Sequence, residues 1–225
     1  MAEIRVMASA AFKPAYLELL PGYERASGNR IVNLWAPSAQ IVSRMKGGEV
    51  VDLVILSAAA LDDLMKAGIV TQRYDLATSG VSVAVKPGAP RPDIGSGDAF
   101  KRAVLAAKSV AYSTGPSGIY LKALFERMGI ADRIKDKVRV VQGEPVGAVI
   151  ARGEAELGLQ QTSELLPVAG IDIVGPLPPD IQEITVFSAG LHAAAKEADA
   201  ARALVAHLKA PAAAQVIRRT GMEPA

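Results

Sequence analysis

Short apolar runs alternate with amphipathic segments along the first third of the chain. Runs of this length are typical of buried strands, and the amphipathic segments have the punctuation of helices, with Pro14 in a first turn and Gly28 or Gly47 just past an end. The pattern predicts strands at 4–7, 31–34 and 53–56 and helices at 14–26, 38–46 and 61–67. This alternation indicates a parallel sheet with crossover helices.

A second set of elements follows residue 80. The pattern predicts strands at 81–85, 110–112, 138–141, 156–160, 171–174 and 185–191, helices at 100–107, 117–128 and 145–151, a proline-rich loop at 176–179, and two final helices at 199–208 and 212–219. The final helices have no strand partners nearby, so we expect them to pack on the first set. We therefore predict an α/β fold of two lobes, with residues 1–79 and 192–225 in lobe 1 and 80–191 in lobe 2. Strands near 80–85 and 185–191 would form the hinge.

Composition narrows the function classes. Of the 225 residues 50% are hydrophobic, and 25 Lys and Arg nearly balance 23 Asp and Glu, so nucleic-acid binding is not expected. No apolar run reaches the roughly 18–20 residues that cross a bilayer. The absence of cysteine excludes disulfides, thiol nucleophiles and thiolate metal sites. The first residues do not form a signal peptide, so we expect either a cytoplasmic protein or the mature form of an exported one.

Motifs for bound cofactors are missing from the sequence. There is no phosphate-binding GxxxxGK[ST] loop, no GxGxxG after a strand and no GxSxG elbow. His192 and His207 lack the spacing of a metal site. We therefore expect no cofactor and no metal.

Small and hydroxylated residues fill five junctions between a predicted strand and the following helix. Backbone N–H groups and the dipole at a helix N-terminus attract anions, and small residues let an anion approach them closely. Ser38 and Ser117 would add hydroxyl donors. The alternative is that each serine only caps its helix. The junctions are residues 9–11, 37–39, 57–59, 113–118 and 142–146.

The same segments carry a resemblance to a known family. In order and spacing, the chain resembles the type II periplasmic solute-binding proteins, in particular the molybdate-binding branch of ABC importers, which also includes aconitate isomerases. The similarity runs over nearly the whole length. It is carried by residues 8–12, 36–39, 51–58 with Leu61, Leu64, Gly68 and Ile69, then 116–120, 144–149 and 153–158.

The resemblance implies a two-lobe fold that closes on a small anion, and it maps ligand positions onto this chain. Molybdate binders usually carry a serine at the position of Ala11 and a tyrosine at that of Gln161. Losing two such donors to a buried oxyanion costs roughly 1.5–3 kcal/mol each, which disfavours molybdate. Lys13 and the amides of Gln160 and Gln161 suit an organic polycarboxylate. The expected ligand-binding residues are Ala10, Ala11, Phe12, Lys13, Ser38, Ser57, Ala58, Ser117, Val146, Gln160 and Gln161.

Two functions follow from the resemblance. The first is a periplasmic binding protein that delivers a small anion, more readily a polycarboxylate than molybdate, to an ABC permease. The second is a cofactor-free isomerase of an unsaturated tricarboxylate such as aconitate, which needs an acid and a base near the substrate. Lys13, Glu144 and Tyr120 are the candidate catalytic residues. A third possibility, the sensing domain of a transcription regulator, lacks support because no helix-turn-helix precedes Ile4.

Overall fold

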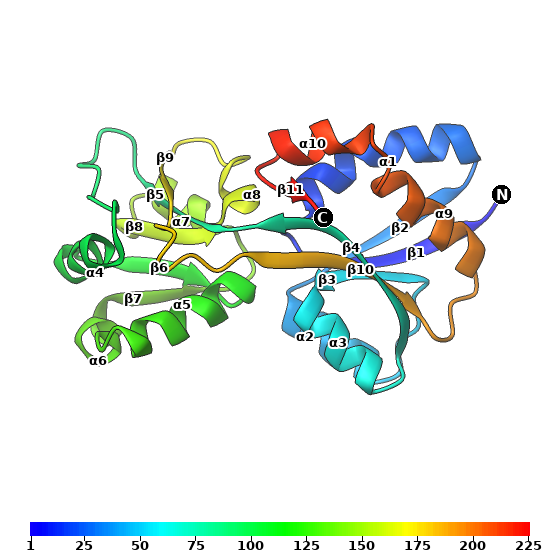
Figure 1. The fold of residues 1–225 in the computed structure, drawn as a ribbon, viewed down its shortest axis with the longest axis horizontal. Helices are drawn as coiled ribbons and strands as arrows, with labels where there is room; N and C mark the ends of the chain where they lie inside the picture. The colour runs from blue at the N-terminus through cyan, green and yellow to red at the C-terminus, as the bar shows by residue number, and fades with distance from the viewer. The chain divides into compact units, whose positions relative to one another are not determined.

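The computed structural model describes all 225 residues and divides into two compact units. One unit combines Met1–Ser79 with Thr185–Ala225, and the other is the continuous segment Gly80–Ile184. The second unit is therefore inserted into the chain of the first (Figure 1).

The first unit is a mixed sheet covered by helices on both faces. Its strands run in the order β11-β4-β10-β3-β1-β2, with β1 parallel to β2 and β3, and β10 antiparallel to β3 and β4. The elements are β1 (Glu3–Ala8), α1 (Lys13–Ser27), β2 (Arg30–Trp35), α2 (Ser38–Lys46), β3 (Leu53–Ser57), α3 (Ala58–Lys66), β4 (Val70–Ser79), β10 (Thr185–His192), α9 (Ala198–Leu208), α10 (Ala213–Arg219) and β11 (Glu223–Pro224).

Alternate side chains on the central strands build two separate cores. Val6 on β1 and Ile55 on β3 pack with α1, α9 and α10, whereas Met7 and Leu56 belong to the cluster that includes α2 and α3. This division follows from the two-residue period of a strand, whose successive side chains point to opposite faces. The parallel strands are buried on both sides and read as continuous apolar runs for that reason.

The second unit has a five-stranded mixed sheet in the order β7-β6-β8-β5-β9. β6 is parallel to β7 and β8, and β5 is antiparallel to β8 and β9. Its elements are β5 (Val81–Val85), α4 (Gly97–Ala106), β6 (Val110–Ser113), α5 (Pro116–Arg127), α6 (Ala131–Ile134), the 3-10 helix η1 (Lys135–Lys137), β7 (Val138–Val141), α7 (Val146–Ala151), β8 (Leu157–Gln161), α8 (Thr162–Leu165) and β9 (Asp172–Pro176).

Among the differences from the sequence-based expectations, three concern β4, β9 and β10. The sequence pattern places the strand at 185–191 in lobe 2, whereas the structure makes it part of β10, which pairs with β3 and β4 in the first unit. The ten-residue strand β4 was not predicted, because its polar side chains interrupt any apolar run. Pro176, expected in a loop, ends β9 opposite Ser82. A proline is tolerated there because β9 is the edge strand of its sheet.

Candidate functional site

In the first unit, three predicted junctions meet at one edge of the sheet. Ala8, near the end of β1, is in register with Trp35 on β2 and Ile55 on β3. The Ser9 N–H donates to the carbonyl of Ile55 at 3.1 Å, and the Ala36 N–H donates to that of Ala8 at 3.3 Å. The structure therefore brings together the junctions that hold seven of the predicted residues: Ala10, Ala11, Phe12, Lys13, Ser38, Ser57 and Ala58.

The serines at this edge do not cap their helices. Ser57 is the N-cap residue of α3, yet its side chain makes no capping hydrogen bond. Ser38 is the first residue of α2, and the N-cap position is taken by Pro37. Of the neighbouring predicted residues, Ala10 is exposed, while Ala11 and Phe12 are 2% and 1% exposed and belong to the core. The side chain of Phe12 thus has a packing role.

Lys13 supplies the positive charge of this edge. It is the first residue of α1, and its Nζ lies 4.7 Å from the centroid of the Trp35 ring. No carboxylate lies within ion-pair distance of it. Trp35 is in turn held edge-on by Tyr16, whose hydroxyl donates to Asn33 Oδ1 at 2.8 Å. Burial raises the pKa of Tyr16, so it stays a neutral donor.

In the second unit, the ends of β6, β7 and β8 form the corresponding edge. Ser113 is in register with Val141, and the Thr114 N–H donates to the Val141 carbonyl at 3.2 Å. Ser117, in the first turn of α5, is 1% exposed and its Oγ lies 3.5 Å from that of Ser113. Gly118 is needed here, because a Cβ at this position would lie 1.6 Å from the Ser113 carbonyl oxygen.

Val146 and Gln160 are brought together at the same edge. The Val146 N–H donates to Gln160 Oε1 at 2.9 Å, and Gln160 Nε2 donates to Glu164 Oε2 at 2.5 Å. Gln160 and Gln161 are 2% and 0% exposed, and Gln161 is also the residue before α8. Sequence reasoning missed Glu164. The available signal was a carboxylate four residues after Gln160, on the short helix that follows a buried strand.

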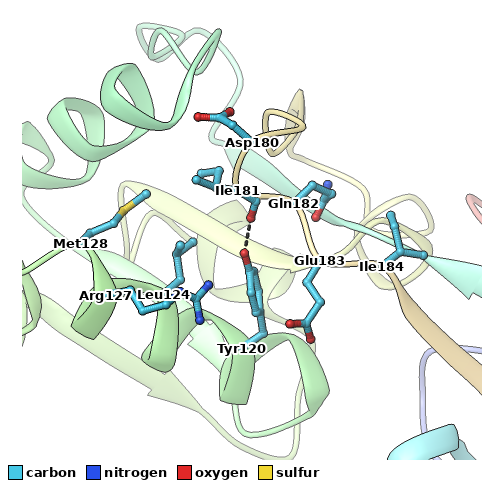
Figure 2. Close-up of a pocket in the computed structure, with 9 residues that line it drawn as sticks. All are labelled: Tyr120, Leu124, Arg127, Met128, Asp180, Ile181, Gln182, Glu183 and Ile184. Atoms are coloured by element: carbon cyan, nitrogen blue, oxygen red, sulfur yellow. Dashed lines mark hydrogen bonds between the residues drawn. The ribbon is translucent and has the colours of Figure 1, made fainter.

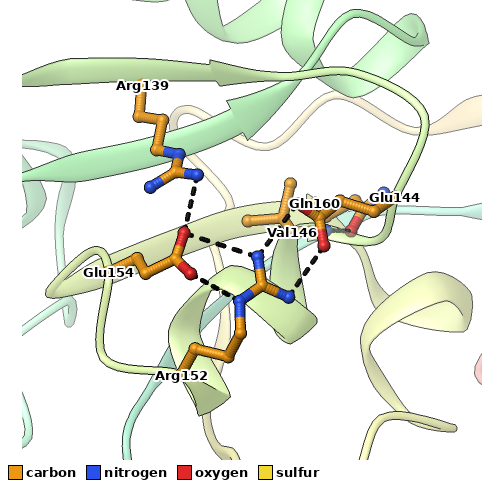
Figure 3. A network of polar contacts seen from close by, with 6 residues as sticks. All are labelled: Arg139, Glu144, Val146, Arg152, Glu154 and Gln160. Carbon is orange, nitrogen blue, oxygen red and sulfur yellow. Dashed lines mark hydrogen bonds and ion pairs between the residues drawn. The ribbon is translucent and has the colours of Figure 1, made fainter.

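Glu144 is held in a surface ion-pair network (Figure 3). Arg152 bonds both Glu144 oxygens, at 2.8 and 2.9 Å, and also pairs with Glu154, which contacts Arg139 at 2.6 Å. The hydrogen bond from Arg152 lowers the pKa of Glu144. A stably charged carboxylate that is already paired is a weak base, which disfavours the catalytic role expected for Glu144.

Tyr120 lines a groove of about 520 Å³ between α5 and residues 180–184 (Figure 2). Its hydroxyl donates to the carbonyl oxygen of Ile181, and the Arg127 guanidinium lies 5.4 Å from its ring centroid. Burial raises the pKa of Tyr120. The hydroxyl therefore ties α5 to the loop before β10 and is not free for proton transfer.

Neither a metal cluster nor a spanning helix is found. No three His, Asp or Glu side chains gather in a way that could hold a metal ion. None of the helices combines the length and the apolar character that crossing a membrane requires.

Comparison with known proteins gives the class. Residues 4–223 match the family of bacterial extracellular solute-binding proteins, and the chain belongs to that family. It is 41% identical to an aconitate isomerase from Pseudomonas sp, covering 98% of this chain and 87% of that protein. It is also 25% identical to the molybdate-binding protein ModA of Azotobacter vinelandii, covering 98% and 89%. The predicted family is thereby confirmed.

Solved structures support the same fold. The periplasmic molybdate-binding protein of Azotobacter vinelandii aligns with a TM-score of 0.79 and 17% identity, covering 97% of this chain and 98% of that one. A tungstate ABC transporter protein from Geobacter sulfurreducens aligns with a TM-score of 0.76 and 15% identity, covering 96% and 98%. The predicted type II periplasmic-binding-protein fold is confirmed.

Proposed function

We propose that this protein binds an organic tricarboxylate of the aconitate type and interconverts its isomers by moving one proton. The support from the comparisons is the 41% identity with an aconitate isomerase, against 25% with a molybdate-binding protein over the same share of the chain. The proposal thus puts the isomerase ahead of pure transport binding. We propose a location outside the cytoplasm, in keeping with the family of extracellular proteins.

The reaction that we propose is an allylic proton shift. A base removes a proton from the methylene carbon of aconitate, the double bond moves by one position, and an acid returns a proton to the former vinyl carbon. The conformation about the bond to the methylene carbon, when the proton is removed, decides whether the product is the cis or the trans isomer. No redox step occurs, so the residues need only hold the carboxylates and transfer the proton.

The unpaired charge of Lys13 is the observation that supports a carboxylate ligand. A cation at the first residue of a helix opposes the positive end of the helix dipole, and Lys13 has no carboxylate to compensate for it. A carboxylate ligand would supply that partner to the ammonium group, whose Nζ lies 4.7 Å from the centroid of the Trp35 ring. Ala11 offers no hydroxyl, so a compact oxyanion gains less at this edge than a ligand whose carboxylates are spread apart.

The edge of the second unit supports the same ligand class. Gln160 and Gln161 present amide groups in an almost fully buried setting, where polar groups must be hydrogen-bonded. The Val146 N–H is already bonded to Gln160. A tetrahedral oxyanion would have to displace this bond to reach the Val146 amide, and would lose part of what it gains there.

The alternative function is binding without chemistry, as the ligand-delivering component of an ABC importer. Family membership favours it, and so does the engagement of two candidate catalytic groups, Glu144 with Arg152 and Tyr120 with Ile181. The ligand class would be the same. The two functions therefore differ in turnover and not in affinity.

Thermal shift measurements test the ligand class. We expect cis-aconitate, trans-aconitate or citrate to raise the melting temperature, and molybdate and sulfate to leave it unchanged. A ligand at about 100 times its dissociation constant adds roughly 2.7 kcal/mol to the free energy of unfolding. A shift with molybdate alone would overturn the proposed ligand class.

A matched pair of variants tests the role of Lys13. Lys13→Met keeps a chain of similar length against Trp35 and removes the charge. Loss of one charge-assisted hydrogen bond should weaken tricarboxylate binding by about ten- to a hundredfold, with no change in the melting temperature of the free protein. The control is Lys122→Met on α5, an exposed lysine without an ion pair. Equal affinities for both variants would remove Lys13 from the site.

A further inference from the structure

Gln160 and Glu164 form a hydrogen-bonded chain with one possible orientation. A backbone N–H can only donate, so the Gln160 side chain must turn its oxygen toward Val146. This leaves Nε2, a pure donor, for Glu164 Oε2 at 2.5 Å. A carboxylate at that position accepts the bond and thereby fixes the side-chain amide of Gln160. Glu164 thus acts on the site edge through Gln160.

Glu164 is electrostatically isolated. The elements packed against α8 are β5, β8 and α7, and none of the three contains a titratable side chain. Glu164 is also the only ionisable residue of α8 itself. The charged residues that follow and precede α7, Arg152 and Glu144, are paired with each other.

The surroundings of Glu164 disfavour its charge. Burial raises its pKa to about 7, although part of the side chain keeps contact with solvent, and the hydrogen bond from Gln160 opposes this rise. The neighbouring Ser163 hydroxyl is fully buried without any hydrogen-bond partner. Unsatisfied polar groups are rare in native proteins, and here one stands beside a carboxyl group that can change its charge.

We propose that Glu164 is a positioning residue for ligand binding. Its charged form holds Gln160 on the Val146 amide more firmly than its neutral form does, because a hydrogen bond to an ionised acceptor is stronger than one to a neutral acceptor. This inference rests on the proposed function, because it concerns the binding of the same tricarboxylate. Ionised Glu164 also adds a negative charge near a negatively charged ligand. Both effects act in one direction, so the ligand binds more tightly when Glu164 is protonated.

Calorimetric titration with cis-aconitate between about pH 5.5 and pH 8.5 tests the proposal. We compare the wild type with Glu164→Gln, which keeps a hydrogen-bond acceptor but cannot ionise. The variant should bind like the wild type at the acidic end and about tenfold more tightly at the basic end. The control, Glu126→Gln, changes an exposed carboxyl on α5 and should follow the wild type at every pH. Comparison within one ligand cancels the titration of the ligand itself.

A second variant keeps the inference testable if Glu164→Gln perturbs the fold. Gln160→Met removes the link between Glu164 and Val146 and should flatten the pH dependence in the same way. Identical pH profiles for the wild type and Glu164→Gln, or for the wild type and a folded Gln160→Met, would overturn the inference and leave the proposed function standing. Failure of the wild type to bind cis-aconitate at any pH would instead overturn the proposed function.

Discussion

Replacing Glu164 with glutamine should change how stability depends on pH. Burial raises the pKa of this carboxyl group from 4.5 to about 7. The folded protein therefore holds the proton more tightly than the unfolded chain does. The stabilisation from Glu164 is fully present below about pH 4.5 and is lost as the pH rises through 7. One pKa unit corresponds to about 1.4 kcal/mol, so the loss amounts to roughly 3 kcal/mol.

Urea unfolding followed by far-ultraviolet circular dichroism at about pH 4 and pH 8 measures this effect. Between these values the stability of Glu164→Gln should rise relative to the wild type by roughly 3 kcal/mol, because glutamine cannot ionise. Other groups titrate equally in both proteins and cancel in the difference. Glu126→Gln, which alters an exposed carboxyl, should show no such change. A constant difference between Glu164→Gln and the wild type at both pH values would refute the reasoning.

Two further substitutions test contacts that stabilise the fold, one between α5 and β6 in the second unit and one around Asp52 in the first. Gly118→Ala places a Cβ 1.6 Å from the Ser113 carbonyl oxygen, so α5 must move away from β6. We expect the free energy of unfolding, measured by thermal unfolding, to fall by about 3 kcal/mol or more, and ligand binding to be lost. A melting temperature like the wild type's would contradict the close approach. Asp52 accepts hydrogen bonds from the amides of Arg5, Lys196 and Glu197, all partly buried. Asp52→Ala should cost about 3 kcal/mol in chemical denaturation, because three partly buried donors lose a charged acceptor. A change below about 1 kcal/mol would refute this role.

Helices and strands whose ends and apolar positions are marked in the local sequence were predictable. Helix α2 begins at Ser38 and ends before a glycine pair, and strand β7 is a short apolar run, so both have the predicted bounds. Pairing between strands is not local, and for this reason the sequence did not reveal that β10 joins β3 and β4. Strand β4 carries polar side chains at most of its positions, although only Thr71 and Gln72 are exposed, and its sequence pattern resembles a loop.

The junctions of the site were predictable for the same local reason, since small residues and serines follow apolar strands. The state of each titratable group was not. Glu144 pairs with Arg152, eight residues later in the chain. The Tyr120 hydroxyl donates a hydrogen bond to the Ile181 carbonyl, which lies on a loop distant in the sequence. Glu164 looks like an ordinary carboxylate in the sequence, and only the apolar elements around it raise its pKa. Partners and burial are set by tertiary packing, which spacing alone does not encode.

Proton nuclear magnetic resonance of cis-aconitate in heavy water, with and without micromolar protein, tests the proposed isomerisation most directly. We predict that trans-aconitate appears and that its methylene carbon carries deuterium, because the returning proton comes from an acid that exchanges with solvent. Bound cis-aconitate that neither isomerises nor exchanges over hours would contradict the isomerase and leave a binding protein.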